Sequence, residues 1–195
     1  MRNEAVQSAR AYLADLSRLF EAVEASAAGD ARMEVDAAVA AAVDMLGELR
    51  RSGRKAMLIG NGGSAAIVSH MQNDLFKMVG LRALVFTEQP LLTALSNDDG
   101  YDTVFRQPVS RWAEPGDLLI AVSSSGESNN IVTAVAAARE RGCKTVTFSG
   151  FKPGNRLRQM GDLNFYVPMV NYGYVELTHS ILGHCISDFA AVGKG

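Results

Sequence analysis

Residues 55–76 are KAMLIGNGGSAAIVSHMQNDLF, a run whose character changes twice along its length. Residues 55–60 are almost continuously apolar, which is typical of a strand buried on both faces of a parallel sheet. A glycine-rich turn follows at residues 60–64, and the residues after it carry apolar side chains at helical spacing. The stretch therefore predicts a strand, a tight turn and a helix, which is the repeating unit of an α/β fold.

The same alternation continues toward the C-terminus. Short apolar or β-branched runs stand at residues 82–87, 117–125, 144–150 and 163–169, separated by segments able to form helices. We predict a three-layer, doubly wound α/β fold with a five-stranded parallel sheet, closed by a helix over residues 174–192.

Residues 3–53 precede the first predicted strand and are rich in alanine. Apolar side chains such as Val6, Leu13 and Phe20 recur at helical spacing, and Gly29 with Asp30 divides the run into two expected helices. Their apolar stripe is longer than one small sheet can bury, so a partner subunit is expected to cover part of it. We expect a single domain over residues 1–195, with a helical prefix (1–53) that contributes to an oligomer and an α/β core (54–195).

Composition narrows the functional classes. Of the 195 residues, 48% are hydrophobic and 21% charged, the balance of an ordinary globular domain. A net charge of −2 leaves no basic excess for nucleic acid, and no apolar run approaches the roughly 18 residues of a membrane span. Cys143 and Cys185 form no CxxC pair, and the N-terminal stretch lacks a signal-peptide pattern. A cytoplasmic protein without nucleic-acid or membrane partners is expected.

Two predicted strand-to-helix loops are suited to phosphate. Residues 60–64, GNGGS, aim backbone N–H groups at an anion, although a tight turn that only needs positive φ would have the same composition. Residues 123–128, SSSGES, place serine hydroxyls at a helix start, where the alternative of a flexible linker has no room. Both loops follow the carboxyl ends of strands, where open α/β sheets bind ligands. Neither matches a dinucleotide or P-loop motif.

With these two loops in this order, the chain resembles the sugar isomerase (SIS) domain family, whose serine-rich loop binds phosphosugars. Three further segments are similar to its phosphoheptose isomerase branch: residues 64–75 with His70, residues 96–101 (SNDDGY), and residues 176–179 (ELTH) followed by His184. The resemblance covers nearly the whole chain. It implies the SIS fold, a homotetramer, a zinc site, and a ketose/aldose isomerase that interconverts sedoheptulose 7-phosphate and glycero-manno-heptose 7-phosphate through an ene-diol.

The resemblance also implies site residues. His70, Asp74, Glu176 and His184 would bind the metal, with zinc the first choice and manganese or iron as alternatives. Asp74 and His184 would also exchange the proton. His70 and Asp74, four residues apart, share one helix face, and Glu176 and His184 lie two turns apart on another. Substrate would contact Asn61, Gly62, Gly63, Ser64, Asp98, Ser123, Ser124, Ser125, Ser128 and Glu176. For Asp98 a turn-forming role is an equal alternative, and His179 fits a structural role better than a ligand role.

Three positions depart from that family's pattern. Asp74 stands for a longer glutamate, Glu176 for a glutamine, and Glu127 for a neutral residue in the serine loop. These departures leave two alternatives open: an isomerase or sensor of a different phosphosugar, and a non-catalytic SIS regulator of the replication-initiation type. The metal and proton-transfer residues favour an enzyme. An oxidoreductase of the Rossmann type lacks its acidic ribose partner.

Overall fold

The computed structural model describes residues 8–192 and contains a seven-stranded sheet in the order β2-β1-β7-β6-β5-β3-β4. Its parallel part confirms the five predicted strands: β3 (Lys55–Gly60), β4 (Arg82–Val85), β5 (Leu118–Ser123), β6 (Lys144–Gly150) and β7 (Leu163–Val167). All five point the same way, so their carboxyl ends meet at one edge of the sheet.

The prediction of a wholly helical prefix is wrong between its two helices. After α1 (Ala9–Glu21), the strands β1 (Glu24–Ala27) and β2 (Ala31–Met33) form an antiparallel hairpin, and only then does α2 (Val35–Ser52) begin. Gly29 and Asp30 adopt positive φ and close this hairpin. Strand β1 adds to β7 with Ala25 opposite Phe165, and this pairing outweighs the local helical preference. Val6 lies outside the described residues.

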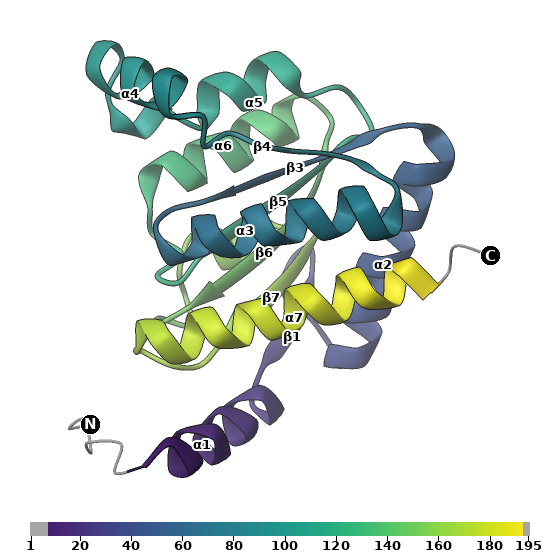
Figure 1. Ribbon diagram of the computed structural model, residues 1–195, viewed down its shortest axis with the longest axis vertical. Coiled ribbons are helices and arrows are strands. Elements are labelled where there is room, and N and C mark those ends of the chain that lie inside the picture. The colour runs from purple at the N-terminus through teal and green to yellow at the C-terminus, as the bar shows by residue number, and fades with distance from the viewer. Residues whose placement is uncertain (1–7, 193–195) are drawn as a thin grey trace.

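Helices cover both faces of the sheet, which confirms the three-layer architecture (Figure 1). The side chains of β5 alternate between the two resulting cores. Leu118, Ile120 and Val122 join the core beneath α2, α3 (Gly63–Asp74) and α7 (Tyr172–Val192). Leu119 and Ala121 join the core beneath α5 (Arg106–Trp112) and α6 (Asn129–Glu140). Such period-two alternation is what a strand buried on both faces requires.

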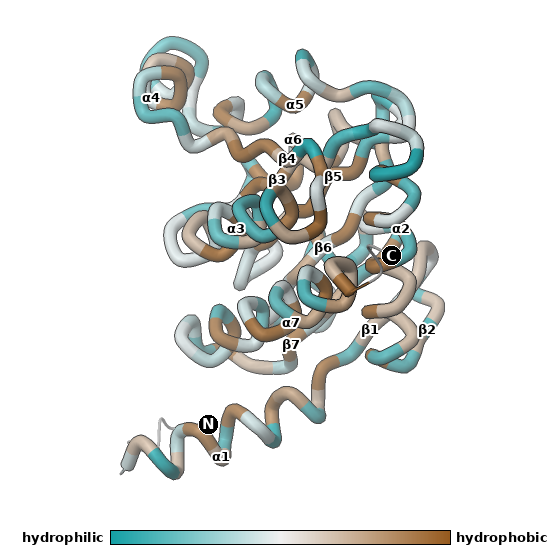
Figure 2. Tube along the Cα trace, turned by 45° about the vertical axis from the view of Figure 1, so that its right-hand side comes forward, coloured by the Kyte–Doolittle hydropathy of each residue, from teal (hydrophilic) through white to brown (hydrophobic). Residues whose placement is uncertain are grey.

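Two helices stand apart from this body. Helix α1 projects from it, and its ring contact with α7 is the stacked pair Tyr12 and Tyr174, with centroids 4.2 Å apart (Figures 1 and 2). Helix α4 (Gln89–Asp98) has no buried residue. Helix α7 begins two residues earlier than predicted, at Tyr172. Three short helices complete the described elements: the π-helix η1 (Leu75–Val79) and the 3-10 helices η2 (Tyr101–Thr103) and η3 (Leu157–Gln159). Among residues 8–192, no helix combines the length and apolarity that crossing a membrane requires.

Candidate active site

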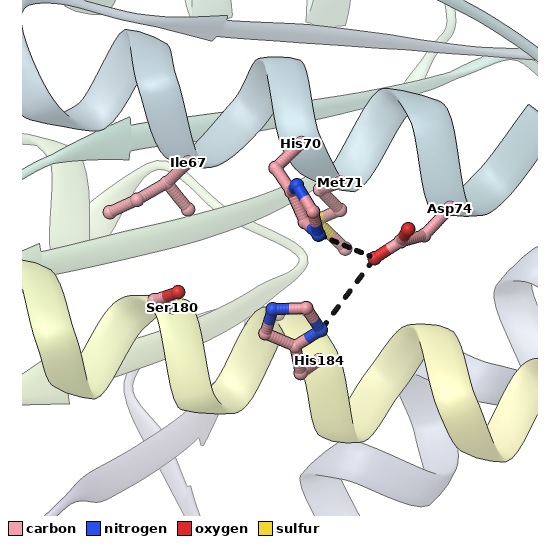
Figure 3. Close-up of a pocket in the computed structure, with 7 residues that line it drawn as sticks. Ile67, His70, Met71, Asp74, Ser180 and His184 are labelled. Atoms are coloured by element: carbon pink, nitrogen blue, oxygen red, sulfur yellow. Dashed lines mark ion pairs between the residues drawn. The ribbon is translucent and has the colours of Figure 1, made fainter.

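The site is formed where α3 and α7 lie side by side on one face of the sheet (Figures 1 and 3). Two glycines make this geometry accessible. A Cβ on Gly60 would lie 2.7 Å from the backbone of Ser64, so glycine lets α3 begin directly over the end of β3. A Cβ on Gly183 would lie 3.8 Å from the sulfur of Met71, an ordinary contact distance, so a residue as small as glycine or alanine lets α7 lie close to α3 there. The two helices therefore bring distant segments of the chain into contact.

Three predicted site residues converge between these helices (Figure 3). The Asp74 Oδ2 atom lies 3.5 Å from His70 Nε2 and 3.6 Å from His184 Nδ1. The two imidazole rings are 5.0 Å apart between centroids. Asp74 is only 6% exposed, whereas the side chains of His70 and His184 are 61% and 47% exposed. The buried carboxylate thus supports two imidazoles that face outward.

This cluster has the chemistry of a metal site. One donor atom from each of the three residues can be chosen so that all lie within 4.8 Å of one another. In a tetrahedral zinc site with bonds of about 2.0–2.1 Å, neighbouring donors are roughly 3.3 Å apart, close to the two distances to Asp74 Oδ2. The pocket beside them has a volume of about 10 Å³, the space of one water or one ion. Two imidazoles and one carboxylate are donors that zinc accepts, so the chemistry of these residues fits a zinc ion.

Glu176 lies outside the cluster of His70, Asp74 and His184. The structure places its carboxyl group against Gly63, where an added Cβ would overlap it. Gly63 is the first residue of α3, so the carboxylate lies at the positive end of that helix, a favourable position for an anion. Glu176 is accordingly not among the three residues whose donor atoms converge.

The serine loop between β5 and α6 is organised by its own hydroxyls. Ser123 Oγ accepts a hydrogen bond from the Gly126 N–H at 3.2 Å and lies 3.4 Å from Ser128 Oγ. Ser125 Oγ accepts from the N–H of Glu127 at 3.2 Å. Ser128 is the N-cap of α6, yet its side chain makes no capping bond. The first N–H groups of α6 therefore have no side-chain cap and are available to an anion.

Ser124 differs from the other hydroxyls of this loop. Its Oγ atom is buried and has no hydrogen-bond partner in the structure. A buried, unpaired hydroxyl costs about 1–3 kcal/mol, and in native proteins such a group usually has a ligand or water as its partner. Ser124 is thus the hydroxyl of this loop that is best placed to bond a bound ligand.

The remaining predicted substrate residues are not gathered in one cluster. Asn61 exchanges two side-chain hydrogen bonds with Asn130, at 3.0 and 2.9 Å, and accepts a third from the Tyr101 hydroxyl. It therefore joins the glycine loop to α6. Ser64 is buried in the first turn of α3. Asp98 ends the exposed helix α4, where its carboxylate accepts from the Asn97 side chain at 2.8 Å.

A segment that the sequence analysis overlooked packs against the serine loop. In residues 151–158, the Leu157 N–H donates to Gly126 O at 3.0 Å, and the Arg156 N–H donates to Glu127 Oε1 at 3.2 Å. The Arg156 guanidinium donates to Asn129 Oδ1 at 2.8 Å. No motif marks this segment, and its only signal is a group of polar and basic residues directly after a predicted strand.

His179 is a structural residue of α7, separate from the cluster. It is 1% exposed, and its Nε2 lies 3.1 Å from the carbonyl oxygen of Ser149. Burial lowers the pKa of His179 to about 4, partly opposed by that carbonyl. The ring is therefore neutral at physiological pH and ties α7 to the end of β6.

Comparison with known proteins agrees with this geometry. The SIS domain family model matches residues 11–150. A phosphoheptose isomerase from Geobacter sulfurreducens is 35% identical over 80% of this chain and 85% of its own length, and one from Pelobacter propionicus is 39% identical over 72% and 77%. The structure of phosphoheptose isomerase from Neisseria gonorrhoeae superposes with a TM-score of 0.81 and 28% identity, covering 93% of this chain and 96% of that one. The chain belongs to the SIS domain family, in its phosphoheptose isomerase branch.

Proposed function

We propose that this chain is a sugar-phosphate isomerase that interconverts sedoheptulose 7-phosphate and glycero-manno-heptose 7-phosphate. The observation that carries the proposal is that His70 Nε2 and His184 Nδ1 both lie close to one carboxylate oxygen, Asp74 Oδ2. A sugar-phosphate sensor needs the phosphate loop but has no use for such a cluster. The relatives named phosphoheptose isomerase support the same substrate.

His70, Asp74 and His184 would hold a zinc ion, with Glu176 as the candidate fourth ligand or as a contact to the sugar. When bound, the ion would polarise the substrate oxygens at C1 and C2. The side chains of His70 and His184 are partly exposed, which leaves room for the substrate beside the ion. Catalytic zinc sites keep such an open position.

Asp74 and His184 would move the proton. In the ketose-to-aldose direction, a base takes a proton from C1 while the oxygen on C2 gains one, which gives an ene-diol. A proton then returns to C2 while the oxygen on C1 loses one. The 3.6 Å approach of Asp74 Oδ2 to His184 Nδ1 orients this imidazole.

The serine loop would hold the phosphate. Its hydroxyls, the uncapped N–H groups of α6 and the buried Oγ of Ser124 together offer several donors to phosphate oxygens. The sugar would extend from there toward α3. The residues proposed for phosphate are Ser64, Ser123, Ser124, Ser125 and Ser128, and those proposed for the sugar hydroxyls are Asn61 and Asp98. Gly62 and Gly63 would contact the substrate through their backbone.

We also propose a cytoplasmic homotetramer. Large apolar side chains are exposed on η1 and α7, including Phe76, Met78, Leu177 and Phe189, and contact with other subunits would bury them. Sedimentation velocity at micromolar concentration is expected to give the mass of four chains, and a monomer would contradict the proposal.

The sharpest test of the proposed chemistry is His184→Ala, with Asp188→Ala as its control. Asp188 is exposed on α7 one turn beyond His184. We expect His184→Ala to abolish isomerisation of sedoheptulose 7-phosphate while circular dichroism and oligomer mass stay unchanged, and Asp188→Ala to keep its turnover. Turnover near the wild-type rate in His184→Ala would refute the assignment.

A further inference from the structure

Arg156 is held beside the serine loop by contacts from two directions. Its backbone N–H donates to Glu127 Oε1 at 3.2 Å, and the next N–H, of Leu157, donates to Gly126 O at 3.0 Å. Behind it, the fully buried Asn155 accepts from the Arg158 N–H and donates to three acceptors of residues 149–152. The backbone that carries Arg156 is thus fixed against the loop.

The guanidinium of Arg156 lies at the first turn of α6. One of its nitrogens donates to Asn129 Oδ1 at 2.8 Å, and Asn129 is the first residue of that helix. The other end of the Asn129 amide points to Asp102 Oδ2 at 3.4 Å, which sets the orientation of the amide. Between residues 8 and 192, the structure pairs this guanidinium with no carboxylate, so most of its five N–H donors are free.

This placement puts a positive charge at the positive end of a helix. The start of α6 carries a partial positive charge, and a guanidinium there is repelled unless an anion joins it. The buried Ser124 Oγ in the same loop has no hydrogen-bond partner among residues 8–192, which is a second and independent observation that points to a ligand. A group with several negatively charged oxygens is the kind of ligand to which both a guanidinium and a hydroxyl donate.

We propose that Arg156 contacts the substrate phosphate and makes the site selective for phosphorylated sugars. The inference rests on the proposed phosphosugar function and adds to the serine hydroxyls the fixed charge that they lack. A guanidinium binds two phosphate oxygens in parallel, which gives both affinity and orientation. Glu127 then has a defined role in the loop, because its carboxylate holds the Arg156 backbone.

The test is the binding of inorganic phosphate to the full chain, measured by calorimetric titration, so that it does not depend on catalysis. Arg156→Gln is compared with Arg139→Gln, which removes the same charge in the last turn of α6, about 15 Å away at 1.5 Å per residue. We expect Arg156→Gln to weaken phosphate binding roughly tenfold or more, Arg139→Gln to have little effect, and Arg156→Lys to recover part of the loss. Turnover should show the same change as a higher KM for sedoheptulose 7-phosphate with kcat largely kept.

Ser124→Ala separates this inference from the proposed function. If Ser124→Ala weakens phosphate binding and Arg156→Gln does not, the role of Arg156 is refuted while the phosphate loop stands. If neither substitution changes phosphate binding, both assignments fall. Equal losses in Arg156→Gln and Arg139→Gln would also overturn the inference, because they would indicate only an effect of net charge.

Discussion

Gly126→Ala should detach the segment that carries Arg156 from the serine loop. Gly126 has a φ of +67°, and a Cβ there would overlap the side-chain amide of Asn155. The left-handed backbone alone costs an alanine about 1–2 kcal/mol. Asn155 cannot move aside freely, because its amide donates to Ser149 Oγ, Gly150 O and Lys152 O at 3.2, 3.1 and 2.8 Å.

The expected loss follows from those bonds. Each buried group left unpaired costs about 1–3 kcal/mol, so one broken bond added to the backbone strain raises the total for Gly126→Ala to about 2–5 kcal/mol. Gly29→Ala is the matched control, since Gly29 has a φ of +76° and open space where the Cβ would stand. It should cost only the backbone strain of about 1–2 kcal/mol.

Urea unfolding of the two variants measures this difference directly, and phosphate titration shows whether the loop still binds. We expect Gly126→Ala to lose about 1–3 kcal/mol more than Gly29→Ala and to bind phosphate weakly. Equal losses of unfolding free energy in the two variants would refute the packing of Asn155 against the loop as the reason for this glycine.

Three further predictions test the phosphate loop, the carboxylate of the site and the buried histidine of α7. Ser124→Ala with Ser128→Ala should weaken phosphosugar binding at least about tenfold in calorimetry with little change in melting temperature, and unchanged affinity would remove the phosphate role of this loop. Asp74→Asn keeps the side-chain volume and should lower kcat by about 10²-fold or more, whereas Asp74→Glu should lower it about tenfold by misplacing the carboxylate. A melting temperature that falls while kcat holds in Asp74→Asn would indicate a structural carboxylate. His179 has a folded pKa of about 4 against 6.5 when unfolded, so its contribution to stability is present above pH 6.5 and is lost as the pH falls toward 4. Urea unfolding at pH 7 and pH 5 should show a loss of roughly 2 kcal/mol that shrinks in His179→Gln, and an identical loss in that variant would contradict the buried neutral ring.

The sequence was informative where local pattern and tertiary environment agree. Strands β3, β5, β6 and β7 are buried along almost their whole length, which is the environment that their apolar and β-branched runs indicate, whereas β4 at the edge of the sheet is partly exposed. The convergence of His70 and Asp74 was predictable because helical spacing sets it within one turn. Their meeting with His184 required the resemblance, since spacing along one helix says nothing about which other helix lies beside it.

The failures have one physical cause, which is pairing between distant segments. The hairpin of residues 24–33 forms because β1 adds to the edge of β7, and nothing local in an alanine-rich run announces that partner. The contact of Arg156 with Asn129 likewise joins a loop to the start of α6, 27 residues away in the sequence. Glu176 is a metal ligand by the resemblance alone, and because its side chain lies against Gly63 in the structure, its ligand role stays a proposal.

The most direct test of the proposed isomerase is hydrogen exchange at C1 and C2 of sedoheptulose 7-phosphate, followed by NMR in deuterated water with protein whose metal content has been measured. We predict about one zinc per chain, incorporation of deuterium at C1 and formation of the aldose phosphate. Removal of the metal by a chelator should stop the exchange, and restoring zinc should bring it back. A metal-free protein that binds the sugar phosphate without exchange or turnover would contradict the proposal and identify the chain as a phosphosugar-binding regulator.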